Sequence, residues 1–194
     1  MSYQIYLLDP VTRECINLNF KHSMYGVNIP CDENLNPVLT TEASLGITYN
    51  YSSYYYEVTE SDKRFAHENE NHEIVYGIRG LYGKTGAESI PMLKDMVTRI
   101  KNKYSYIDKN GEVQWLTGKR TANIYRDRNG YEVSFDCYIM NIGKESFTIE
   151  EKEYEVSEGD MSDYWEETAA NAIRPLYQLL AMAQLRPDGI WDGD

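Results

Sequence analysis

A row of carboxylates near residue 150 is the feature whose chemistry is easiest to anticipate. In an extended strand, alternate side chains point to the same side, so three of these glutamates are expected to share one face. Like charges that stand side by side on a sheet are mildly destabilising. The row therefore serves either solubility alone or contact with a basic partner, to which it would imitate the phosphates of a nucleic acid. Its members are Glu150, Glu151, Glu153, Glu155 and Glu158, followed by Asp160.

Tyrosines form a second conspicuous group, with five of them in the eight residues 49–56. Tyrosine offers a large rigid contact area with a hydrogen-bonding tip, which suits recognition surfaces. Tyrosine also favours strands and their edges for structural reasons alone. Tyr54, Tyr55 and Tyr56 are candidate partner-binding residues on the first interpretation, and they need no partner on the second.

The segment Gly83-Lys84-Thr85 has the residue types of a phosphate-binding loop, in which backbone amides, a lysine and a hydroxyl hold phosphates. The register does not fit, because the leading glycine of that motif would have to stand at position 78, which is Ile78. We therefore expect a glycine-mediated turn between a strand and a helix here. A small hydrolase or nucleotide-handling enzyme centred on residues 80–89 remains the alternative.

Other residues with chemical potential do not combine into a site. His67 and His72 are five residues apart, whereas two zinc-binding histidines on one helix face need a spacing of four. The serines, histidines and three cysteines form no nucleophile motif. We expect no catalytic residue, no metal site and no cofactor.

The last seven residues combine carboxylates with an aromatic side chain. Asp188, Asp192 and Asp194 have the oxygens that a hard cation prefers, but their spacing matches no calcium loop. We instead expect Trp191 to anchor this tail to the body of the protein while the carboxylates face water.

The composition of the chain is acidic and is typical of one folded domain. It has 194 residues and a net charge of −12, and a single core of this size is ordinary. Residues 145–194 contain 13 Asp and Glu against 3 Lys and Arg, a net charge of −10. Direct binding to nucleic acid is not expected, because that affinity comes from Lys and Arg at the phosphates.

Several signals indicate the compartment. No apolar run approaches the roughly 18 residues that span a bilayer, and residues 1–9 lack the basic and small-residue features of a signal peptide. Three widely spaced cysteines imply no disulfide framework. We expect a cytoplasmic protein of a bacterial host cell with no membrane contact.

Two helices and several hairpins must position these residues. Apolar side chains at helical spacing predict helices at about 88–104, with Ser89 as N-cap, and at 162–185. Alternation predicts a strand at 45–51, and the turn at Asp9 predicts an opening hairpin of residues 3–8 and 13–18.

Two Asn-Gly turns, at residues 108–111 and 127–130, predict hairpins between the two helices. Residues 121–125 and 131–139 are expected to pair across the second turn, and residues 146–156 to add a further pair of strands. The fold class is therefore α+β, an antiparallel sheet and hairpins packed with two main helices, in a single domain of residues 1–194.

Three phrases in the chain resemble a loose group of small proteins found in phage, mobile-element and bacterial genomes. They are residues 46–52, residues 77–91, and the segment from Trp165 to the closing Arg-Pro-Asp-Gly-Ile-Trp-Asp-Gly-Asp. Members of that group join the two helices more directly, so the resemblance implies that residues of about 104–158 are an insertion. It carries over no activity and no functional residue.

Such a setting favours a protein that acts by binding. We expect a non-enzymatic acidic interaction protein that docks on a basic protein surface, such as a host nuclease, in the manner of anti-CRISPR, anti-restriction or DNA-mimic inhibitors. This expectation rests on analogy and on the charge of residues 145–194. A third possibility is an accessory structural phage protein that assembles into oligomers through its tyrosine-rich segment.

Overall fold

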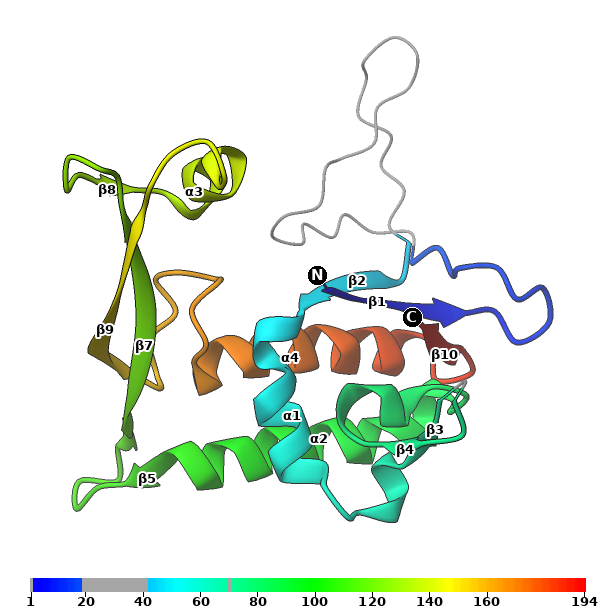
Figure 1. The fold of residues 1–194 in the computed structure, drawn as a ribbon. Coiled ribbons are helices and arrows are strands. Elements are labelled where there is room, and N and C mark those ends of the chain that lie inside the picture. The colour runs from blue at the N-terminus through cyan, green and yellow to red at the C-terminus, as the bar shows by residue number, and fades with distance from the viewer. Residues whose placement is uncertain (1, 19–41, 70) are drawn as a thin grey trace, which may run out of the picture.

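The computed structural model describes residues 2–18, 42–69 and 71–194 and has an α+β fold with antiparallel sheets (Figure 1). A three-stranded sheet in the order β10-β1-β2 joins Ile190–Gly193, Ser2–Leu8 and Ser44–Thr48. The predicted opening hairpin is confirmed only next to its turn, where Leu8 bridges Cys15 and the Asp9 and Ile16 amides donate to the Glu14 and Leu7 carbonyls at 2.9 and 3.0 Å; residues 13–18 form no strand. The longer ladders of β1 are those with β10 and β2 on its two sides.

Two long helices build most of the core, as predicted from their apolar spacing. Helix α4 (Ala169–Leu185) lies between the three-stranded sheet and helix α2 (Gly86–Tyr104) (Figure 1). Leu93 and Ile100 from α2 and Leu176 and Leu179 from α4 are fully buried in one cluster with the sheet. No described helix is both long enough and apolar enough to span a bilayer.

Both helices begin at positions other than the predicted ones. Helix α2 starts at Gly86 because Thr85 and Glu88 form a reciprocal capping box, so Ser89 is not the N-cap. Helix α4 starts at Ala169 with Thr168 as N-cap, and the predicted first turn at 162–168 is a loop. The hydroxyl caps therefore decided both helix starts.

The predicted strand at 45–51 ends at Thr48, where the chain turns into helix. Residues Tyr49–Tyr51 form the 3₁₀ helix η1 and Ser52–Thr59 form helix α1. The Thr48 hydroxyl accepts a hydrogen bond from the Asn50 amide at 3.3 Å, which favours a turn at this point. Beyond α1 come η2 (Lys63–Phe65), the short hairpin β3 (His67–Glu68) and β4 (Ile74–Val75), and η3 (Gly77–Leu81).

The segment between α2 and α4 is built from hairpins and projects from the body (Figure 1). Both predicted Asn-Gly turns are confirmed, because β5 (Ser105–Ile107) pairs with β6 (Val113–Trp115) and β7 (Thr117–Arg126) pairs with β8 (Glu132–Val133). The predicted strand at 131–139 is wrong beyond Val133, since Phe135–Asn141 form helix α3. The predicted pair of strands within residues 146–156 is wrong, since Thr148–Ser157 form one strand, β9, which is the main partner of β7.

Candidate interaction surface

Strands β7 and β9 form a long two-stranded ribbon. Their register runs from Thr117 opposite Ser157 to Arg126 opposite Thr148. Along β9, Val156 is the one buried residue, so most of the strand is open to solvent. A two-stranded sheet is at best marginally stable by itself. The ribbon must therefore be held by contacts at its ends.

The two faces of the ribbon differ in charge, because side chains alternate along each strand. We use the name acidic face for the side formed by odd-numbered residues. They are Lys119, Thr121 and Asn123 on β7 and Glu151, Glu153 and Glu155 on β9. The opposite face is formed by Arg120, Ala122, Ile124 and Arg126 with Glu150, Lys152 and Tyr154. One face is thus net negative and the other net positive.

The glutamates of the ribbon are only partly neutralised by their neighbours. On the acidic face, Lys119 Nζ lies 2.6 Å from a Glu153 oxygen, and on the opposite face Arg126 Nε lies 3.4 Å from Glu150. Glu151 and Glu155 are exposed and belong to no ion pair among the described residues. These two carboxylates are the ones that remain available to a basic partner.

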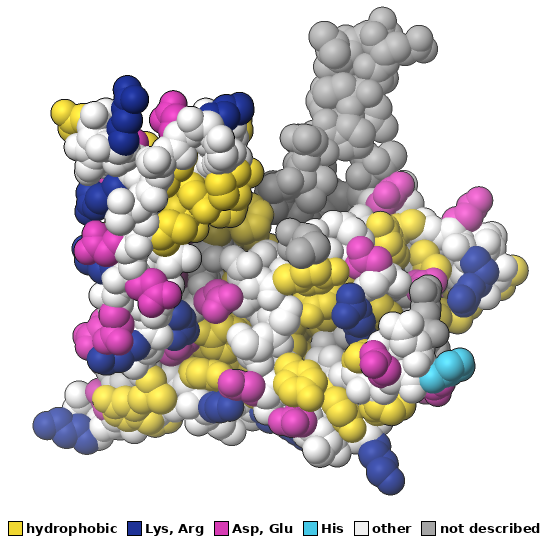
Figure 2. Space-filling model, in the orientation of Figure 1, with side chains coloured by type: hydrophobic (Ala, Val, Ile, Leu, Met, Phe, Trp, Pro, Cys, Tyr) yellow, Lys and Arg dark blue, Asp and Glu magenta, His cyan; other side chains and the backbone are white. Residues whose placement is uncertain are grey.

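Helix α3 places an apolar surface at the far end of the ribbon. The ring of Tyr138 stacks on that of Tyr125 at 4.5 Å, so α3 packs against the end of β7, on the side of the ribbon that faces the body (Figure 1). Hydrophobic side chains gather where α3 lies (Figure 2). The exposed members of this apolar tip are Tyr131, Phe135, Ile139, Met140, Ile142 and Ile149.

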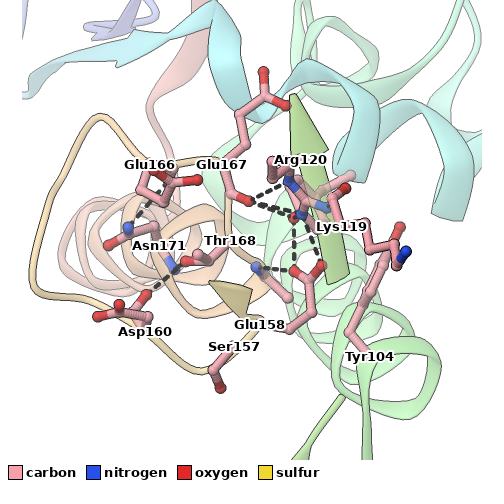
Figure 3. Close-up of polar contacts among 12 residues, drawn as sticks. Tyr104, Lys119, Arg120, Ser157, Glu158, Asp160, Glu166, Glu167, Thr168 and Asn171 are labelled. Carbon is pink, nitrogen blue, oxygen red and sulfur yellow. Dashed lines mark hydrogen bonds and ion pairs between the residues drawn. The ribbon is translucent and has the colours of Figure 1, made fainter. Parts of the chain in front are cut away.

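The base of the ribbon is fastened to the body by a buried ion pair (Figure 3). Glu158 is 3% exposed, and its carboxylate accepts hydrogen bonds from Arg120 Nη2 at 2.7 Å, from the Tyr54 hydroxyl at 2.7 Å and from the Ala169 amide at 2.9 Å. Arg120 also donates to the carbonyl of Glu167 at 2.8 Å. The cluster joins β7, the end of β9, α1 and the first turn of α4.

This environment has a clear electrostatic effect on the tyrosine at its centre. Burial and the adjacent Glu158 carboxylate raise the pKa of Tyr54 well above its usual value. The hydroxyl therefore stays protonated and keeps donating to Glu158. Because the Ala169 amide belongs to the first turn of α4, the carboxylate also stabilises the positive end of that helix.

Both the tyrosine group and the acidic row contain some residues that are buried and others that are exposed. Tyr54 and Tyr55 are 3% and 1% exposed, and the Tyr55 hydroxyl donates to the carbonyl of Ala172 at 2.8 Å. Tyr56 is 45% exposed. Asp160 accepts a hydrogen bond from the Ser162 amide at 2.8 Å, which orders the loop before α4.

Three predicted partner-binding residues, Glu158, Tyr54 and Tyr55, therefore hold the fold together from within. Of the others, Glu150 and Glu153 stand on the ribbon in ion pairs. The basic residues Lys119 and Arg126 of β7 would have indicated that cations lie near the glutamates of β9. That signal could be used only with the β7–β9 register known.

The glycine-rich stretch before α2 is a joint for the last strand of the sheet. The amides of Gly83, Gly86 and Ala87 donate to the carbonyls of Trp191, Gly189 and Pro187 at 2.9, 2.7 and 2.8 Å. Every amide from residue 82 to residue 89 has a partner within the protein. No amide donor in this stretch is left to hold a phosphate.

At two positions of this stretch another backbone segment comes so close that only glycine fits. A Cβ on Gly80 would lie 2.4 Å from the carbonyl oxygen of Phe65, and one on Gly86 would lie 2.5 Å from that of Arg186. Real Cβ atoms do not approach other atoms this closely, so larger residues would force the segments apart. The glycine pattern thus has a packing cause.

The predicted anchor at Trp191 is confirmed. Its side chain is 1% exposed, and its indole Nε1 donates to the Ser89 hydroxyl at 2.8 Å. Asp188 and Asp192 are exposed, and Asp188 forms an ion pair with Arg186 at 2.7 Å.

The remaining candidates for chemistry stand apart from one another. His72 pairs with Glu68 at 2.5 Å in the β3–β4 hairpin, and His67 packs edge-on against Tyr82. Burial and the nearby Glu42 raise the pKa of the Cys15 thiol to about 11, which disfavours the nucleophilic thiolate. Within residues 2–18, 42–69 and 71–194, no three His, Cys, Asp or Glu side chains are grouped to hold a metal ion.

Comparison with known proteins adds no relative to this description. No protein-family profile, curated protein or solved structure matches the chain.

Proposed function

We propose that this chain is a non-enzymatic binding protein that docks on a basic protein surface through the acidic face and the apolar tip of its projecting ribbon. One observation carries the proposal: unpaired carboxylates and exposed apolar side chains occur together on a projecting element that contributes little to the core (Figure 1). Apolar and aromatic side chains dominate the centres of protein interfaces, and charges at their rims guide association.

The partner that this surface fits is an enzyme with a positively charged channel for nucleic acid, such as a host defence nuclease. Glu151 and Glu155 stand two strand positions from Glu153, so their carboxylates form a row with a regular spacing. Such a row competes with phosphates for Lys and Arg. The resemblance to proteins of phages and mobile elements points to the same class, with inhibition as the outcome.

Charge reversal at the two free glutamates tests the proposal. The immobilised full chain is used to capture proteins from the cells in which it occurs, and each captured protein is then measured as a purified binding partner at increasing salt. We expect Glu151→Lys with Glu155→Lys to weaken binding of a basic partner at least about tenfold, because attraction becomes repulsion. The salt dependence of the affinity should fall as well.

The matched control reverses two carboxylates that lie elsewhere. Glu60 and Glu112 are exposed and form no ion pair among the described residues, so Glu60→Lys with Glu112→Lys makes the same change in net charge. This variant should retain the partner. Equal loss in both variants would show that only net charge matters, and full binding by the ribbon variant would remove the acidic face from the interface.

A further inference from the structure

Arg79, in η3, is a half-buried cation that forms no ion pair with the acidic side chain of a described residue. Its Nε donates to the main-chain oxygen of Asp194 at 3.1 Å, and its guanidinium lies over the Tyr3 ring at 5.0 Å from the centroid. No carboxylate of a described residue is recorded within 4.0 Å of it, and neither terminal nitrogen donates to a described residue. The side chain is thus held in place while its two terminal nitrogens donate to no described residue.

Two cavities meet at this guanidinium. One has a volume of about 340 Å³ and is bordered by His67, Asn69, Asn71, Tyr82, Gly193 and Asp194. The other, of about 380 Å³, is bordered by Tyr3, Tyr56, Tyr76 and the hydroxyl-bearing Ser52 and Ser53. Arg79 and Val75 line both. These volumes fall in the range of about 300–1,000 Å³ that is typical of small-molecule sites.

The lining chemistry differs between the two cavities and defines a ligand. Tyr56 and Tyr76 meet edge to face at 6.2 Å and offer aromatic surface on one side of Arg79. His67, Asn69 and Asn71 offer polar groups on the other side, where Asp194 adds a carboxylate that accepts a hydrogen bond from the Gln4 amide at 2.8 Å. A guanidinium pairs with carboxylates and phosphates through two parallel hydrogen bonds.

We propose that this site binds a small anion carried on an aromatic ring, with the carboxylate or phosphate against Arg79 and the ring against Tyr56 and Tyr76. The glycine-rich stretch gives the site its rigidity: Gly77 has a φ of 88°, a conformation that suits glycine, and its amide donates to the Thr59 hydroxyl at 2.8 Å. The site is remote from the ribbon and is independent of the function proposed above.

The test is an NMR titration of the full chain with four probes. 4-Hydroxybenzoate and phenyl phosphate carry a ring and an anion, benzamide carries the ring without charge, and inorganic phosphate carries the anion without a ring. We expect at least one aromatic anion to shift the signals of Tyr76, Gly77 and Arg79 with a dissociation constant on the order of 0.1–1 mM. Benzamide and inorganic phosphate should bind about tenfold more weakly.

Variants locate the binding. Arg79→Gln should weaken the aromatic anion about tenfold or more, whereas Arg128→Gln, which removes an exposed arginine of the β7–β8 turn, should leave binding unchanged. Because Arg79 also holds Asp194, Tyr56→Ala provides a second variant at a more exposed position, and it should weaken the ring contact several-fold. Absence of saturable shifts with both aromatic anions, or equal binding by wild type and Arg79→Gln, would overturn the proposal. Preference for a carboxylate or for a phosphate assigns the anion.

Discussion

Replacing Glu158 by methionine is expected to lower the free energy of unfolding by about 3 kcal/mol, because it leaves Arg120 charged and unpaired in a half-buried site. The change also removes the acceptor of the Tyr54 hydroxyl and of the Ala169 amide. Urea unfolding followed by circular dichroism measures the loss. Hydrogen exchange should rise first in β7 and β9, since the cluster is what joins them to α1 and α4.

Two further variants serve as controls for the Glu158→Met change. Glu153→Met breaks an ion pair whose partners are each more than 60% exposed, so it should cost no more than about 1 kcal/mol. Arg120→Met combined with Glu158→Met removes both charges, and its cost should be less than the sum of the two single changes. If Glu158→Met were as mild as Glu153→Met, the cluster would not be what anchors the ribbon.

Replacing Trp191 by alanine is expected to cost about 3–5 kcal/mol, since it opens a large cavity under the three-stranded sheet and removes the hydrogen bond to Ser89. Thermal or urea unfolding measures the effect. The same change at Trp165, which is 65% exposed in the loop before α4, makes a matched control expected to stay within about 0.5 kcal/mol. Similar losses at both tryptophans would contradict the role of the last strand as part of the core.

The parts of the fold that could be predicted are those determined by local pattern. Apolar side chains at helical spacing identified α2 and α4, and Asn-Gly pairs identified two hairpins, where Gly111 and Gly130 both take a φ of 83°. The poor fit to the phosphate-loop motif also indicated a structural role for the glycine-rich stretch, although the 3₁₀ helix η3, and not the expected strand, leads into the turn before α2. Each of these signals lies within a few residues along the chain.

The parts that were missed depend on contacts between distant segments. The sequence suggests that Tyr54 and Tyr55 are strand or surface residues. In the structure their hydroxyls donate hydrogen bonds to Glu158 and Ala172, more than a hundred residues away in the chain. Tertiary burial overrides the strand preference of tyrosine there. From the sequence, Glu158 was expected to belong to an exposed row of glutamates. In the structure it follows the last residue of β9 and points inward to accept a hydrogen bond from Arg120.

Helix α3 illustrates the same limit at the surface. Residues 131–139 alternate well enough to suggest a strand, but the Ser134 hydroxyl caps the Cys137 amide at 3.2 Å and begins a helix. The helix then stacks on Tyr125 of the ribbon. The apolar half of the candidate surface therefore could not be found from the sequence, whereas its acidic half could.

Photo-crosslinking from the two faces of the ribbon tests the central claim most directly. A benzophenone amino acid is placed at Asn123 on the acidic face or at its neighbour Ala122 on the opposite face, both exposed positions of β7, and the chain is irradiated in its native cells. The proposed docking face predicts that position 123 crosslinks to a basic nucleic-acid-binding enzyme and that position 122 gives little of the same product. Equal crosslinking from both positions, or from 122 alone, would contradict the proposed docking face.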